Sequence, residues 1–66
     1  MIVNADELEV GKSYTFSQIK DVVRITSGTV TSVIRDGRFV TIKCAESGTR
    51  KIVDLDVISR IELLLD

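Results

Sequence analysis

Few residues of this chain are of a type that does chemistry. It has no histidine, the commonest general base and a frequent metal ligand. Cys44 is the single cysteine, and its alternation with Val40 and Ile42 predicts that it faces the core as a structural residue. Asp54 and Asp56 share one strand face, a spacing seen in metal and acid–base sites, but two acids at a strand end are typical of a solvated turn. We therefore expect no catalytic residue, no metal and no cofactor, and we predict that the protein is not an enzyme.

The basic residues indicate one candidate function, binding to RNA or single-stranded DNA. Nine Lys and Arg stand against ten Asp and Glu, so the net charge is −1, whereas nucleic-acid binders usually carry a basic excess. The acids concentrate near the two ends, and the middle of the chain holds most of the cations. The candidate nucleic-acid face is Arg24, Arg35, Arg38, Phe39, Lys43, Arg50 and Lys51, with Phe39 or Tyr14 stacking on bases. Aromatic residues are few, so nucleic-acid binding is the alternative function.

Aliphatic residues favour the other candidate function, protein binding. A domain of 66 residues buries only about 60% of the surface that its unfolded chain exposes, and self-association is a common remedy for such a small core. The candidate protein interface is Val22, Val33, Leu64 and Glu62. We expect a non-enzymatic binding module that forms a homo-oligomer or regulates a larger protein, as a small bacterial or phage regulator would.

These residues must be positioned by β-strands, and residues 24–42 hold the clearest signal. Asp36-Gly37 lies between two runs rich in β-branched residues, the pattern of a hairpin with a type I′ turn. Ahead of the turn the apolar face changes from odd positions, Val23 and Ile25, to even positions, Val30 and Ile34, between Ser27 and Val30. Because a one-residue slip needs a bulge or bend, we predict that the first strand folds over at Gly28.

The remaining elements are short. Asn4 and Glu7 have the spacing of a capping box, so we expect one helical turn near the N-terminus. Ile19 should anchor a polar connector after the first strand, and Gly48 should take the positive-φ position of a later turn. Besides the hairpin, we expect strands over residues 12–16, 50–55 and 60–65. The last segment also fits helical spacing, but its β-branched residues favour a strand with Ile61, Leu63 and Leu65 facing the core and Leu64 facing out at the sheet edge.

Together these elements predict a mostly β domain over residues 1–66, a small, five-stranded, strongly bent antiparallel barrel with a short N-terminal helical turn. The run from Asp54 to Ile61 resembles the passage between the last two strands of Hfq-type Sm-like proteins: Val57, Ile58 and Ser59 match the aliphatic-Ile-Ser portion. The uridine-contacting Lys and His of that family have no counterpart here. Residues 47–61 are also similar to Sm-like inhibitors of the termination factor Rho. The resemblance implies an SH3-like or Sm-like barrel and edge-to-edge assembly.

Two further expectations concern location. No apolar run approaches the roughly 20 residues of a membrane span, and no signal sequence opens the chain, so we expect no membrane partner. A single cysteine cannot form an internal disulfide, which favours a reducing compartment such as the cytoplasm.

Overall fold

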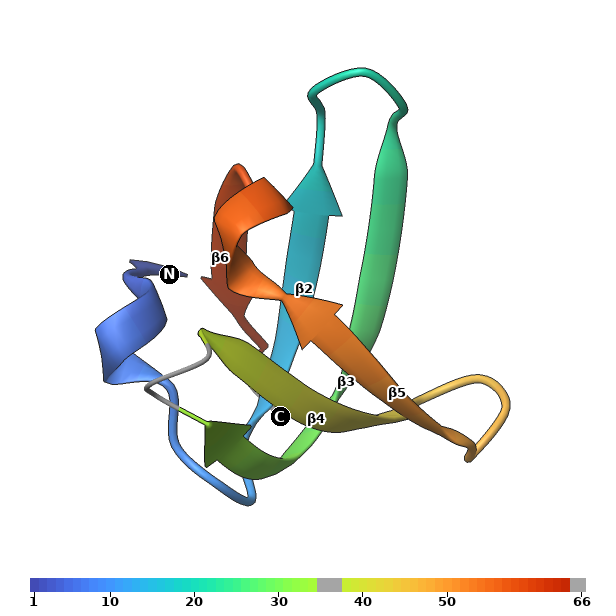
Figure 1. The fold of residues 1–66 in the computed structure, drawn as a ribbon. Helices are drawn as coiled ribbons and strands as arrows, with labels where there is room; N and C mark the ends of the chain where they lie inside the picture. The colour runs from blue at the N-terminus through green and yellow to red at the C-terminus, as the bar shows by residue number, and fades with distance from the viewer. Residues whose placement is uncertain (35–37, 65–66) are drawn as a thin grey trace.

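The sheet has six strands and is antiparallel throughout (Figure 1). We describe residues 1–34 and 38–64 of a computed structural model. The strands are β1 (Ile2–Val3), β2 (Ser13–Gln18), β3 (Arg24–Ile34), β4 (Phe39–Cys44), β5 (Arg50–Asp54) and β6 (Arg60–Leu63), with 3₁₀ turns η1 (Ala5–Glu7) and η2 (Leu55–Val57). Their order across the sheet is β1-β6-β2-β3-β4-β5, so β1 and β5 are the two edges and the sheet is not closed.

The mostly-β prediction is confirmed, and the end of the chain is a strand rather than a helix as far as Leu63. The described strands number six, because Ile2–Val3, expected only as an apolar start, pairs with β6. Closure into a five-stranded barrel is not observed. The predicted Asp36-Gly37 turn and the inward position of Leu65 lie outside the described residues.

The core forms because alternate residues of each strand point to the same side. In β4 the even positions Val40 and Ile42 are fully buried, as predicted, and Cys44 is half-buried against the core. Tyr14 and Phe16 do the same in β2, with ring centroids 6.1 Å apart. The buried core residues are Leu8, Tyr14, Phe16, Val30, Val40, Ile42, Val53 and Ile61.

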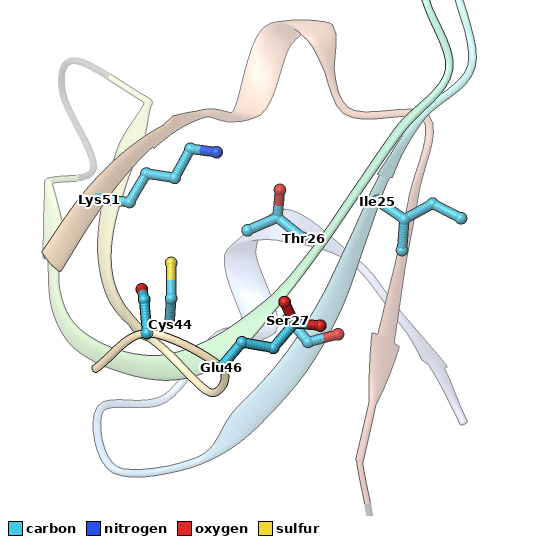
Figure 2. Close-up of a pocket in the computed structure, with 7 residues that line it drawn as sticks. Ile25, Thr26, Ser27, Cys44, Glu46 and Lys51 are labelled. Atoms are coloured by element: carbon cyan, nitrogen blue, oxygen red, sulfur yellow. The ribbon is translucent and has the colours of Figure 1, made fainter. Parts of the chain in front are cut away.

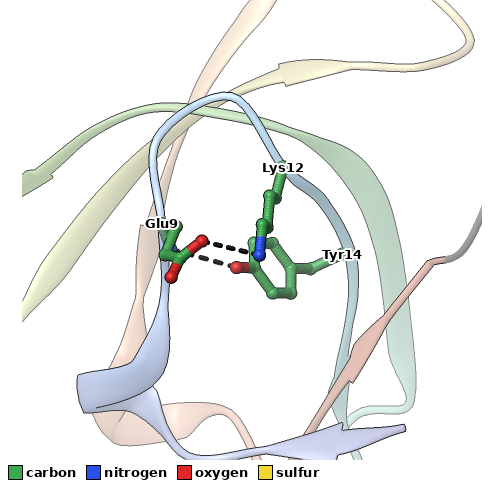
Figure 3. A network of polar contacts seen from close by, with 3 residues as sticks. All are labelled: Glu9, Lys12 and Tyr14. Carbon is green, nitrogen blue, oxygen red and sulfur yellow. Dashed lines mark hydrogen bonds and ion pairs between the residues drawn. The ribbon is translucent and has the colours of Figure 1, made fainter.

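Tyr14 serves the core rather than a stacking surface. Only 1% of it is exposed, and its hydroxyl accepts a hydrogen bond of 3.0 Å from the Glu9 backbone N–H (Figure 3). Lys12 Nζ lies 2.7 Å from the Glu9 carboxylate, which raises the pKa of Lys12 by hydrogen bonding and by its charge. The prediction that Tyr14 could stack on a base is therefore wrong, because the ring is buried in the core and the hydroxyl is hydrogen-bonded to the backbone.

The N-terminal turn forms where the sequence predicts it. At η1 the Glu7 carboxylate accepts a hydrogen bond of 2.8 Å from the Asn4 backbone N–H, the reach-back contact of a capping box. The Ile19 prediction is wrong: β2 continues to Gln18, and Ile19 lies 59% exposed in the loop that follows it.

Gly28 is important for a different reason from the one predicted. Thr26, Gly28 and Val30 all face the inside of the sheet, so the alternation does not slip at Gly28. The register shift comes at Thr31, where Val30 pairs with Ile42 but Ser32 pairs with Thr41. Gly28 is buried between β2 and β4, opposite Tyr14 and Cys44, and a Cβ there would lie 2.6 Å from the Lys43 carbonyl oxygen.

This close approach predicts that Gly28→Val lowers the free energy of unfolding by at least about 1 kcal/mol, because the new side chain must push β4 away from β3. Chemical denaturation measures the change. Ser32→Val is the matched control, since Ser32 is an exposed position of the same strand and tolerates a β-branched residue. An unchanged denaturation midpoint in Gly28→Val would contradict the close approach.

Candidate functional site

The most distinctive surface feature is the open edge of β5. At the two ends of its pairing with β4, Cys44 N–H donates to the Thr49 carbonyl and Leu55 N–H donates to the Arg38 carbonyl, at 2.8 and 3.0 Å. Because hydrogen-bonded pairs alternate in an antiparallel ladder, Lys51 and Val53 also bond to β4.

The residues between them turn their backbone groups the other way. Arg50 and Ile52 each point both the backbone N–H and the backbone C=O away from β4. Asp54 points its N–H the same way, whereas its carbonyl belongs to the N-cap of η2. No further strand follows β5 in the described sheet. A row of five backbone groups, which we call the β5 edge, is therefore available for pairing with another chain.

A groove runs beside this edge. Two adjoining pockets share Thr26 of β3 and Lys51 of β5; one extends toward Glu46 in the turn before β5, and the other toward Val57 in η2. In Figure 1 β5 crosses the β2–β3 hairpin instead of lying along it, and the two pockets are lined by residues of both β3 and β5. We call the two pockets together the β3–β5 groove.

The groove carries two cations without a carboxylate partner among the described residues. Figure 2 shows the Lys51 side chain extending from β5 toward Thr26, with the Cys44 sulfur on the wall of the same pocket. Arg24 lines the adjoining pocket with Lys51. Neither cation takes part in the ion pairs found in the described part of the chain. Glu46 and Asp54 line the same two pockets, so the groove carries charges of both signs.

The outer face of β4 and β5 is different in character. Ile52, opposite Thr41, is 67% exposed. Lys43 lies directly opposite Arg50, a like-charged cross-strand pair that is unfavourable without an anion nearby. Phe39, opposite Asp54, is 37% exposed.

The predicted nucleic-acid residues therefore do not share one face. Arg24 and Lys51 lie at the groove, whereas Lys43, Arg50 and Phe39 lie on the outer face. A further arginine, Arg38, pairs with Asp56 at 3.3 Å. Arg35 lies outside the described residues.

The predicted protein-interface residues are also dispersed. Val22 is exposed in the β2–β3 loop, and Val33 is half-buried against the core. Glu62 lies in β6, and exposed Leu64 follows that strand, with its N–H donating to the Ser13 carbonyl at 2.9 Å. The expectation that the last strand is an open edge is wrong, because β6 has β1 on one side and β2 on the other.

The two aspartates have structural roles. Asp54 accepts a hydrogen bond of 3.0 Å from Asp56 N–H and so caps η2, while Asp56 makes the ion pair with Arg38. Within residues 1–34 and 38–64, no cluster of three His, Cys, Asp or Glu could hold a metal ion. None of the helices described here is long and apolar enough to cross a membrane.

Sequence reasoning missed Ile52 and the β5 edge. One signal was available: Ile52 and Val53 are adjacent, and neighbouring residues of a strand cannot both face the core. Val53 is buried, so Ile52 must face outward. The same rule applies to the exposed residue Ile25, which the predicted slip placed inside.

Comparison of the chain with protein families, with curated proteins and with solved structures returned no match. The site is therefore interpreted from its own geometry.

The position of Cys44 leads to a prediction about its reactivity. Because the residue is half-buried and its sulfur lines the pocket, we expect native protein to react with iodoacetamide more slowly than urea-unfolded chain, yet measurably. Mass spectrometry of timed samples gives both rates. Complete protection until unfolding would place the sulfur inside the core, as the alternation alone predicts, and equal rates would place it fully in solvent.

Proposed function

We propose that this domain is a non-enzymatic protein-binding module that takes up an extended segment of another protein as an additional strand on β5. The observation that carries the proposal is the β5 edge, whose backbone groups at Arg50, Ile52 and Asp54 point away from β4. Strand addition gives affinity through main-chain hydrogen bonds and specificity through alternate side chains.

The surroundings of the edge support this use. Natural sheets protect their edges with charged side chains, prolines, bulges or covering loops. Of these devices, β5 carries the charged residues Arg50, Lys51 and Asp54. The chain has no proline, the register shift of the described strands lies in β3, and Ile52 adds an exposed aliphatic side chain at the middle of the edge. An added strand would satisfy the backbone groups and cover Ile52 together.

The charges indicate what the added segment carries. Side chains of such a strand alternate between the outer face and the β3–β5 groove. On the groove side they meet Arg24 and Lys51, which lack carboxylate partners among the described residues. The proposed segment presents acidic side chains to these two cations, and basic or polar ones where Glu46 or Asp54 lines the groove.

The finer assignments are part of this proposal. A curved sheet with an open edge suits the Sm-like or SH3-like resemblance, and a module of this size suits a regulator that binds a larger protein. The free thiol of Cys44 suits a reducing compartment, and we place the protein in the cytoplasm.

Blocking the edge tests the proposal. Binders are selected on the folded protein from a library of random short peptides, and their affinity is measured by isothermal titration calorimetry. We expect Ile52→Pro to abolish binding, because proline lacks the N–H at the centre of the edge. Since Ile52 N–H does not bond to β4, the sheet should persist, as circular dichroism can verify.

Ile52→Ala is the matched control, since it shortens the same side chain but keeps the N–H, and we expect it to retain binding at reduced affinity. Amide shifts of labelled protein should change most at Arg50, Ile52 and Asp54 when peptide is added. Peptides that bind Ile52→Pro as well as they bind the wild type would contradict strand addition at β5.

One observation favours RNA binding as a second candidate function. Lys43 and Arg50 face each other on the same outer face as Phe39, with the Thr41–Ile52 pair in between, so a phosphate could relieve their repulsion while the base of a neighbouring nucleotide stacks on the ring.

This second function predicts that affinity for single-stranded RNA falls steeply as salt rises, and that Lys43→Gln reduces the salt slope by about one. Fluorescence anisotropy with a labelled RNA of random sequence measures both. Lys20→Gln, which removes the same charge from the β2–β3 loop, is the control. Absence of binding at low salt excludes the RNA function.

A further inference from the structure

The β5 edge is complementary to itself. Two β5 strands placed antiparallel about a two-fold axis at Ile52 bring Ile52 opposite its own copy and Arg50 opposite Asp54 of the second molecule. These are the residues whose backbone groups face the open edge. In this register the outward N–H and C=O groups of the two strands face each other, so they can form about four backbone hydrogen bonds without breaking any bond to β4.

The charges select this register. Arg50 and Asp54 lie on the same outer face, so the two-fold centred on Ile52 produces an opposite-charge pair twice. A two-fold shifted to Arg50 or to Lys51 would place that cation against itself, and one shifted to Asp54 would oppose two carboxylates. One shifted to Val53 would place Asp54 opposite Ile52. Of these arrangements, only the one centred on Ile52 pairs unlike charges.

The neighbouring strand adds to the complementarity. Lys43 lies beside Arg50, and Phe39 beside Asp54, on the same outer face. Across the axis, Asp54 of the second copy would therefore approach both Arg50 and Lys43, which offsets their mutual repulsion. Arg50 of the second copy would come within reach of the Phe39 ring, an arrangement that favours a cation–π contact.

We propose that, without a partner protein, the β5 edge is occupied by β5 of a second copy, in an antiparallel two-fold dimer centred on Ile52. The inference rests on the proposed function, since it uses the same backbone groups. It adds regulation, because self-pairing covers the edge and an acidic partner segment must displace the second copy. The apparent affinity for the partner segment therefore falls as the concentration of this domain rises.

Charge exchange tests the register. Sedimentation equilibrium should show a dimer for the wild type, whereas Arg50→Asp opposes two carboxylates at both ends of the interface and should raise the dimer dissociation constant at least about tenfold. Lys20→Asp, with the same change in charge on the β2–β3 loop, should leave the constant unchanged. In the double variant Arg50→Asp/Asp54→Arg, the pair is restored with its polarity reversed, and dimerisation should return.

Because Asp54 caps η2, the double variant can lose stability, and a crosslink provides a second measurement. In a Cys44→Ser background, Ile52→Cys should form a covalent dimer with a short bifunctional thiol reagent, and Val23→Cys, similarly exposed but in the β2–β3 loop, should not. Equal crosslinking at both positions would overturn the two-fold.

The outcomes separate the two proposals. A monomeric wild type that still binds selected peptides through Ile52 overturns self-pairing and leaves the protein-binding function in place. A dimer that Arg50→Asp does not weaken overturns the register, whatever the peptides do. A dimer with the expected charge dependence supports self-pairing, and if no peptide competes with it, only the protein-binding function fails.

Discussion

The close contact between β3 and β4 at Gly28 is the constraint on which the rest of the sheet depends. With hydrogen in place of a side chain at Gly28, the Lys43 carbonyl oxygen lies only 2.6 Å from the position that a Cβ would take, so the two strands can approach closely in the interior. The extra residue Thr31 then shifts the register and brings Val33 toward the core. Together these features fold the sheet over, so that β5 crosses the hairpin and the β3–β5 groove is formed (Figure 1).

The alternation of residues within a strand and the turn residues correctly predicted features that depend only on neighbouring positions in the sequence. The alternation of Val40 and Ile42 correctly assigned the buried face of β4, and Gly48 takes the positive φ that its turn requires. The same reasoning failed at Val23, Ile25 and Ile34, which are exposed, because it treated aliphatic residues as inward-facing wherever they occur. In so small a protein the interior has room for few side chains, and many aliphatic residues remain outside.

The candidate site was harder to predict because edge status depends on strand order. Two residues, Ile2–Val3, are too short to show a period, yet their pairing with β6 covers the edge that the last strand would otherwise leave open, while β5 is the edge at the opposite end of the sheet. Whether Arg24 and Lys51 share a groove likewise depends on the way the sheet folds over, and not on their separation in sequence. Individual exposed residues were foreseen in part, but their grouping was not.

The place of β6 has a consequence for the order of folding. The pairings β2–β3, β3–β4 and β4–β5 each join neighbours in the chain. In contrast, β6 must enter between β1 and β2, joining residues from 43 positions apart (Ser17 and Arg60) to 60 positions apart (Ile2 and Glu62). Closing so long a loop costs more entropy than closing a hairpin, so we expect the meander from β2 to β5 to pair before β6 docks. Until β6 docks, β2 as well as β5 has an unpaired edge, and both edges can pair with another chain.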